Sequence, residues 1–224
     1  MSSTLAVFDL DGTLVDTPRG IVETFTAAFA TMGLEAPRPE EIRATIGLPL
    51  ERAFGSLMGV ADDDPRVAEG VRQYLSAFRE IVLPKAADLL FPGVAQGLAA
   101  LEDDGVILAV ATSKFSASAD ALLTSAGLKH HFRMVVGADQ VAHPKPHPES
   151  GQVILRELGM DGERAVMVGD TTHDLLMARA CGMRSIGVTY GVHGVEELRS
   201  AEPTWLVDTF DDVLDRIATA SVRD

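Results

Sequence analysis

The sequence contains several short runs of apolar residues that alternate with segments of helical spacing. Because these runs are apolar throughout, both faces of each strand are expected to be buried. The predicted strands are Leu5 to Leu10, Val106 to Ala111, Met134 to Val136, Ala165 to Val168, Ser185 to Val188 and Trp205 to Leu206. The predicted helices between them are Val94 to Glu102, Ser116 to Ser125, Pro148 to Leu158, Thr172 to Ala180 and Phe210 to Ala218. This alternation predicts an α/β fold with a doubly wound, Rossmann-like parallel sheet covered by helices on both faces.

The segment before Phe91 has a different pattern. Arg19 to Met32 places apolar residues on one face of a helix, and Gly33 fits its end. Pro37 to Lys85 is helical in character, and Asp64 is suited to cap a helix that runs from Pro65 to Leu83. A chain of 224 residues is long enough for one sizeable core and a small second domain. We therefore expect a helical insertion in the α/β domain.

Composition limits the partners and the compartment. The formal net charge of -14 argues against binding to nucleic acid or to an anionic membrane surface. The single cysteine, Cys181, excludes an internal disulfide framework and fits a reducing compartment. The N-terminal residues do not resemble a signal peptide, and no long uncharged apolar stretch occurs. We therefore expect a cytoplasmic protein.

Two carboxylates one residue apart, Asp9 and Asp11, follow the first predicted strand and precede Gly12. Since strand side chains repeat with a period of two, both carboxylates point to the same side and repel each other unless they share a cation or a proton. Other strands also end in polar groups, namely Thr112-Ser113-Lys114, Gly169-Asp170 and Thr189-Tyr190-Gly191. Ligands of parallel sheets bind at the carboxyl ends of the strands, so these groups are expected at one rim.

The residue types at this rim suit a metal ion and an anion. Asp9, Asp11 and Asp170 supply oxygen ligands of the kind that Mg²⁺ prefers, and Asp174 follows Asp170 by about one helical turn. Lys145 stands between two prolines, which restrict the backbone and so fix the direction of its side chain. A positioned ammonium is suited to neutralise the charge of a phosphoryl group.

Other polar residues are less informative. His143 and His147 are interpreted as polar surface, because the sequence offers no clear third metal ligand beside them. Cys181 is interpreted as a small core residue. Arg43 and Arg52 are candidates for contacts to a substrate carboxylate, but their helical surroundings favour solvated side chains.

Taken together, the motifs resemble those of the haloacid dehalogenase superfamily of phosphohydrolases. The motifs are Asp9-Leu10-Asp11-Gly12-Thr13, Thr112, Lys145, and Gly169-Asp170 with Asp174, in that order. Within the superfamily, the chain is most similar to phosphoglycolate phosphatases and their near relatives. The resemblance implies a core domain formed by residues 1–17 and 91–224, with an inserted helical cap domain at residues 18–90.

The resemblance also implies a role for each motif residue. Asp9 would be the nucleophile that forms an aspartyl-phosphate, and Asp11 would be the general acid and base. Mg²⁺ would be held by the carboxylates of Asp9 and Asp170 and by the backbone carbonyl of Asp11. Thr112, Ser113 and Lys145 would bind the phosphoryl group, and Asp174 would orient the metal site or Lys145. The expected activity is the hydrolysis of a small, phosphoglycolate-like phosphomonoester.

Two alternatives stay open. A sugar phosphomutase similar to β-phosphoglucomutase shares the first motif, but such mutases tend to carry an arginine three residues after a glycine of the cap. Here Gly47 is followed by Leu48-Pro49-Leu50, so the arginine is absent, which argues against a mutase. The other alternative is a non-catalytic binding or regulatory protein, against which the complete set of mutually repelling carboxylates argues. The loop at Gly47 is expected to select the substrate, and the sequence does not identify the substrate or the oligomeric state.

Overall fold

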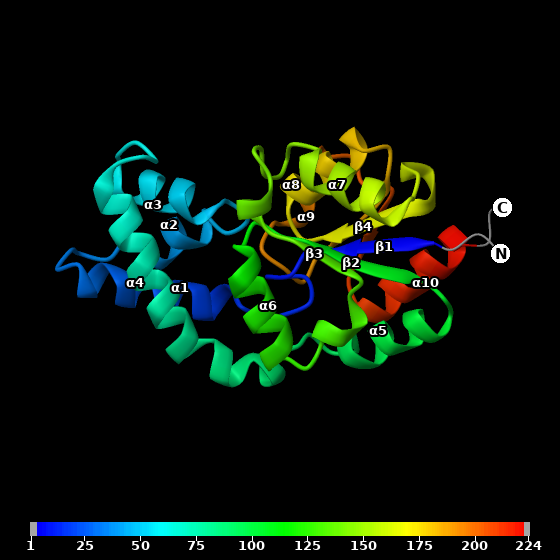
Figure 1. Ribbon diagram of the computed structural model, residues 1–224, viewed down its shortest axis with the longest axis horizontal. Coiled ribbons are helices and arrows are strands. Elements are labelled where there is room, and N and C mark those ends of the chain that lie inside the picture. The colour runs from blue at the N-terminus through cyan, green and yellow to red at the C-terminus, as the bar shows by residue number, and fades with distance from the viewer. Residues whose placement is uncertain (1–3, 222–224) are drawn as a thin grey trace.

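The structure is a computed structural model that describes residues 4–221. Six strands form one parallel sheet in the order β3-β2-β1-β4-β5-β6, which confirms the predicted doubly wound α/β fold (Figure 1). The strands are β1 (Leu5–Phe8), β2 (Ile107–Ala111), β3 (Met134–Val136), β4 (Ala165–Gly169), β5 (Arg184–Val188) and β6 (Trp205–Val207). In the centre of the sheet, Leu5 is in register with Ile107 on one side and with Ala165 on the other.

Helices cover both faces of the sheet. Figure 1 shows α7 and α8 on one face and α5, α6 and α10 on the other. Their bounds are α5 (Val94–Asp103), α6 (Ser116–Ser125), α7 (Glu149–Leu158), α8 (Thr172–Ala180) and α10 (Phe210–Ser221). Strand β1 supplies both cores, since Phe8 packs in the cluster that contains Phe210 while Val7 packs in the one that contains Met177. The fully apolar strands are therefore explained by burial on two sides.

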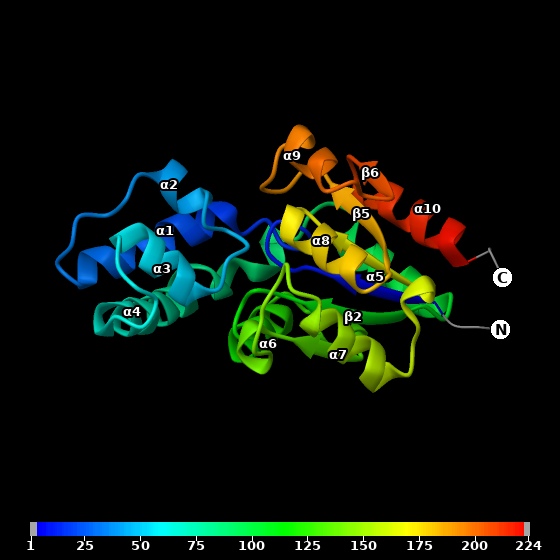
Figure 2. The same ribbon diagram turned by 90° about the horizontal axis from the view of Figure 1, so that it is seen from above.

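Residues 18–89 form a helical segment beside one end of the sheet (Figures 1 and 2). It consists of α1 (Pro18–Thr31), α2 (Pro39–Arg43), α3 (Leu50–Met58), α4 (Pro65–Ile81) and a 3₁₀ segment (Leu83–Leu89). Aromatic rings fill its interior, and the Phe25 ring centroid lies 4.8 Å from that of Phe54 and 4.7 Å from that of Tyr74. Asp64 caps α4 as predicted, because its carboxylate accepts a hydrogen bond from the backbone N–H of Arg66.

The two chain crossings between the sheet and the helical segment lie side by side. Val15 forms an antiparallel bridge with Leu90. The backbone N–H of Asp16 donates to the carbonyl of Leu89 at 2.7 Å, and the N–H of Phe91 donates to that of Leu14 at 3.2 Å. The chain therefore enters and leaves the helical segment through one hydrogen-bonded pair of chain segments.

The structure differs from the predicted elements mainly at boundaries. Strand β1 ends at Phe8 rather than Leu10, and α4 ends at Ile81 before the 3₁₀ segment. Helix α9 (Val195–Ser200) was not predicted, because it is short and only Leu198 of its residues is buried. One buried side chain gives no helical periodicity to detect. Within residues 4–221, no helix has the length and apolar character needed to cross a membrane.

Strand order reverses at the centre of the sheet, where β1 lies between β2 and β4. The connections that leave these strands diverge to opposite sides and open a crevice at their carboxyl ends. This is the end of the sheet beside which the helical segment lies (Figure 2). Residues that follow β1, β2 and β4 are therefore brought together there.

Candidate active site

Asp9 directly follows β1 and is 6% exposed. Its backbone N–H continues the sheet by donating to the carbonyl of Val168 in β4 at 2.9 Å. The chain then turns sharply at Gly12, whose φ of +84° lies in the region that favours glycine. A Cβ atom at Gly12 would lie 2.2 Å from Oδ2 of Asp170, so the turn brings the backbone directly against a second carboxylate.

Lys145 links two of the predicted site residues. Its ammonium donates to Oδ1 of Asp9 at 2.7 Å, to Oδ1 of Asp174 at 2.6 Å and to the carbonyl of Ala111 at 2.9 Å. Burial alone lowers the pKa of Lys145, but Asp174 and Asp9 raise it above its usual value. The side chain is therefore a permanently charged cation in a buried position.

Asp170 and Asp174 are both fully buried. Oδ1 of Asp170 accepts from Thr13 Oγ1 at 2.9 Å, and its Oδ2 accepts from the N–H of Val192 at 2.8 Å. Asp174 lies in the first turn of α8, and its Oδ2 accepts from the N–H of Thr171 at 3.1 Å and from its hydroxyl at 2.7 Å. Each carboxylate is therefore held in one orientation.

The carboxylates at this site outnumber the cations that face them. Ligand oxygens of Asp9, Asp170 and Asp174 lie within 4.8 Å of one another, and Lys145 is the ammonium that contacts this cluster. The pKa of Asp9 is raised to about 7, mainly by burial. Lys145 lowers this pKa, and the nearby Asp174 raises it further. Burial, Asp9 and Asp174 also raise the pKa of Asp170 well above its usual value. A hard divalent cation fits this set of oxygen donors and would balance the excess negative charge.

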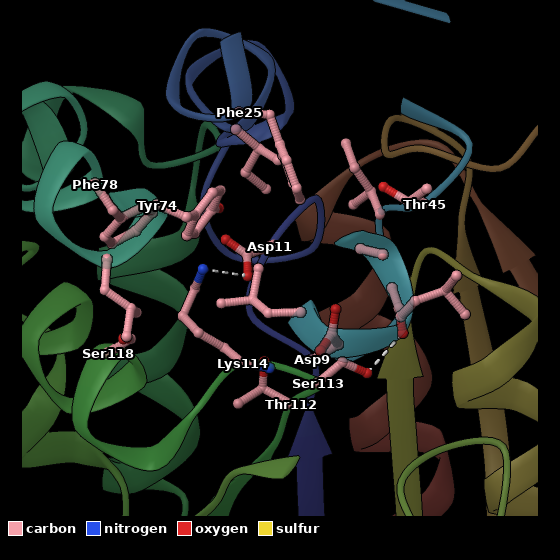
Figure 3. A pocket seen from close by; sticks show the side chains of 17 residues that line it. Asp9, Asp11, Phe25, Thr45, Tyr74, Phe78, Thr112, Ser113, Lys114 and Ser118 are labelled. Carbon is pink, nitrogen blue, oxygen red and sulfur yellow. Dashed lines mark hydrogen bonds and ion pairs between the residues drawn. The ribbon is translucent and has the colours of Figure 1, made fainter. Parts of the chain in front are cut away.

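Asp11 has partners that the cluster of Asp9, Asp170 and Asp174 does not share. Its Oδ1 accepts from the hydroxyl of Thr17 at 2.6 Å, and its Oδ2 lies 3.0 Å from the ammonium of Lys114 (Figure 3). The side chain of Asp11 is 13% exposed and lines the pocket between the sheet and the helical segment. Asp9 and Asp11 are close in the sequence but have different partners, which gives the two carboxylates different chemical properties.

The loop after β2 also contacts the helical segment. Thr112 is buried and lines the pocket with Asp9 and Asp11. The hydroxyl of Ser113 donates to the carbonyl of Gly47 at 2.7 Å, and the ammonium of Lys114 lies 4.3 Å from the ring centroid of Phe78 (Figure 3). This loop therefore joins the two parts of the molecule.

Two residues near the site were not found by sequence reasoning. Thr17 holds Asp11, but a threonine before a helix is ordinarily a cap and gives no separate signal. His173 lies under the Gly47 loop, and its Nδ1 is buried with no hydrogen-bond partner in the part of the chain that the structure describes. Burial lowers the pKa of His173. His173 is recognised as a residue near the site only because the loop at Gly47, which is distant in sequence, packs against it.

Other candidates lie outside the pocket. Arg43 is exposed, and Arg52 is 58% exposed with its Nε 3.9 Å from Asp62. His143 and His147 are exposed, and each has Nδ1 within 3.9 Å of the same oxygen of Glu149. Cys181 is half-buried, and burial raises the pKa of its thiol to about 11, as expected for a packing residue.

This chain is similar to several known proteins. The family model for haloacid dehalogenase-like hydrolases matches residues 6–188. A Dickeya dadantii protein named "Probable phosphatase IndB" is 56% identical, over 94% of this chain and 91% of that protein. A protein of Pectobacterium atrosepticum named "Phosphoglycolate phosphatase" is 32% identical, over 96% of this chain and 92% of that protein. The solved structure of CbbY from Rhodobacter sphaeroides in complex with phosphate has a TM-score of 0.78 and 26% identity, and covers 95% of this chain and 96% of that one.

Proposed function

Because this chain belongs to the haloacid dehalogenase-like hydrolase family and is a phosphatase, we propose that it hydrolyses a small phosphomonoester through an aspartyl-phosphate on Asp9. The observation that carries the proposal is the hydrogen bond of Asp9 to the buried ammonium of Lys145, beside a pocket that both Asp9 and Asp11 line. The solved relative that holds phosphate supports the same substrate class.

In the first step, a carboxylate oxygen of Asp9 attacks phosphorus and the bond between phosphorus and the ester oxygen breaks. Asp11 donates its proton to that oxygen, so the alcohol leaves uncharged at this position. In the second step, Asp11 takes a proton from a water molecule while that water attacks phosphorus. The bond between Asp9 and phosphorus breaks, which releases phosphate and restores both carboxyl groups.

Lys145 and the loop after β2 position the phosphoryl group in this proposal. The ammonium of Lys145 holds Asp9 at 2.7 Å and is itself fixed by Asp174, so its charge is in place before the substrate arrives. Thr112 and Ser113 provide hydroxyls at the edge of the same pocket. Phosphoryl transfer depends mainly on positioning and charge neutralisation, which these residues supply.

We propose Mg²⁺ as the metal, held by the carboxylates of Asp9 and Asp170 and by the backbone carbonyl of Asp11. When bound, Mg²⁺ would offset the repulsion between the nucleophile and the phosphate. Asp174 then has a positioning role through Lys145 and Thr171. The buried excess of carboxylates supports a divalent cation at this site.

We propose that residues 18–90 are a cap domain over a core domain formed by residues 1–17 and 91–224. The pocket has walls from both parts, so the cap would exclude water during the reaction and open for product release. Sequence composition alone supports a cytoplasmic location and the lack of a nucleic-acid partner, and both stay predictions.

The proposal is tested by phosphate release from p-nitrophenyl phosphate and from alkyl phosphomonoesters. We expect release that requires Mg²⁺, stops with EDTA and falls at least a thousandfold in Asp9→Asn. Asp16→Asn is the matched control, since Asp16 is an exposed carboxylate in the same segment and should retain activity. Unchanged turnover in Asp9→Asn contradicts the mechanism, and sugar-phosphate interconversion without net phosphate release indicates a mutase.

A further inference from the structure

The pocket above Asp9 and Asp11 has two chemically different walls. The charged side chains that line it, Asp9, Asp11 and Lys114, all come from the α/β part. Figure 3 shows Phe25, Tyr74 and Phe78 facing these residues from the helical segment. The further lining residues from that segment that the structure describes are uncharged, among them Ile21, Leu48 and Leu50. The wall that the helical segment contributes is therefore uncharged and mostly aromatic and aliphatic, and the hydroxyl of its Thr45 donates to the carbonyl of Ile42 at 2.7 Å.

The cations nearest to this wall are already engaged. The ammonium of Lys114 contacts Oδ2 of Asp11 at 3.0 Å and the Phe78 ring at 4.3 Å. A substrate carboxylate that took Lys114 as its partner would have to displace Asp11 from this contact. Arg52 lies nearest to Asp62, and among the described residues that line the pocket no guanidinium occurs.

Tyr74 adds one polar group to this wall. The residue is 3% exposed and lines the pocket, and its hydroxyl has no hydrogen-bond partner within residues 4–221. Burial and the nearby charge of Asp11 hold the pKa of Tyr74 well above its usual value, so the hydroxyl keeps its proton. Because the residue lines the pocket, a polar atom of the substrate beside it would give this hydroxyl a partner.

We propose that the leaving group is an uncharged alcohol with an apolar, aromatic or alicyclic face and one polar atom within reach of Tyr74. This inference rests on the proposed phosphatase function and concerns the part of the substrate that the proposed function left open. A carboxylate-bearing leaving group such as glycolate would lose hydration at this wall without gaining a cation. An apolar group gains from burial against Phe25, Phe78 and Leu50.

The first experiment compares kcat/KM for benzyl phosphate and 2-phosphoglycolate, which are both esters of primary alcohols. We expect benzyl phosphate to be preferred at least tenfold, because burial of a few apolar carbons discriminates by about ten- to two-hundredfold. Equal rates or a preference for 2-phosphoglycolate overturn the inference but leave the phosphatase function standing. If neither ester nor p-nitrophenyl phosphate is hydrolysed, the proposed function itself is wrong, and the inference falls with it.

The second experiment places a cation in the wall. Leu48 is half-buried and lines the pocket, whereas Leu57 is half-buried and lies outside it. Leu48→Arg should raise the ratio of kcat/KM for 2-phosphoglycolate over benzyl phosphate at least tenfold, and Leu57→Arg should leave the ratio unchanged. Thermal unfolding checks that both variants fold. A ratio that moves equally in both variants, or in neither, contradicts selection by this wall.

Discussion

The ammonium of Lys145 lies 2.7 Å from Oδ1 of Asp9, although the two residues are 136 positions apart in the chain. The same ammonium lies 2.6 Å from Asp174, so one buried cation serves two buried carboxylates. Removing it would leave both carboxylates without their partner, which is far more costly than the loss of an exposed ion pair.

We therefore predict that Lys145→Met lowers kcat at least a hundredfold and the free energy of unfolding by about 3 kcal/mol or more. Kinetics with p-nitrophenyl phosphate and urea unfolding measure the two effects. Lys129→Met is the control, because Lys129 contacts Asp120 at the surface and should change neither quantity noticeably. Full activity in Lys145→Met would exclude a role for this ammonium in binding the phosphoryl group.

Thr17→Val removes the hydroxyl that orients Asp11. We predict a fall in kcat of about tenfold for an alkyl phosphate, whose leaving oxygen needs a proton. The fall should be small for p-nitrophenyl phosphate, because nitrophenolate leaves without protonation. Thr31→Val is the control, since its hydroxyl bonds only within α1. An equal fall for both esters would mean that Thr17 acts on something other than proton transfer.

Gly12→Ala tests the close approach of the turn to Asp170. At φ +84°, alanine is strained, and its Cβ would also lie 2.2 Å from Oδ2 of Asp170. Gly33→Ala separates the two effects, because Gly33 has φ +70° with nothing within 4 Å of a Cβ. We expect Gly33→Ala to cost about 1 kcal/mol and to leave activity intact. Gly12→Ala should cost clearly more and weaken Mg²⁺ binding, as measured by unfolding and calorimetry.

The raised pKa of Asp9 predicts how stability changes with pH in EDTA. Between the unfolded value of 3.8 and the folded value of about 7, the folded protein holds a proton that the unfolded chain releases. The contribution of Asp9 is therefore complete below pH 3.8 and is lost as the pH rises through about 7.

Urea unfolding at pH 5.5 and pH 8 checks this direction. We expect the wild-type protein in EDTA to lose more stability between these values than Asp9→Asn, while Asp16→Asn follows the wild type. Mg²⁺ should stabilise the protein more at pH 8 than at pH 5.5, because the metal competes with protons for the carboxylates. A larger Mg²⁺ effect at pH 5.5 would contradict the assignment.

Much of the fold was predictable from sequence because burial leaves a local pattern. The apolar run of β2 and the helical spacing of Ile21, Phe25 and Phe29 in α1 each need only neighbouring residues to be recognised. The strand-end argument pointed to Asp9, Asp11 and Asp170, and the flanking prolines pointed separately to Lys145. In the structure, ligand oxygens of Asp9 and Asp170 lie within 4.8 Å of each other, and Lys145 contacts Asp9.

The remaining features depend on approaches between distant segments. The hydroxyl of Tyr190 donates to the carbonyl of Thr13 at 3.0 Å. The position of a tyrosine after β5 does not predict this contact. The contact of Lys114 with Phe78 and the uncharged wall around Tyr74 depend on how the helical segment is positioned relative to the sheet. No local spacing encodes that arrangement, so substrate selection could not be predicted from the motifs.

The paired crossings at Val15 and Leu90 have a consequence for how such proteins diversify. Because the two ends of the helical segment meet, the segment can be exchanged for one of another length or shape while β1 and α5 keep their positions. An insertion whose two ends meet is covalently joined to the rest of the fold at one place. New substrates can thus be acquired by replacing the insertion, with the reacting groups inherited unchanged.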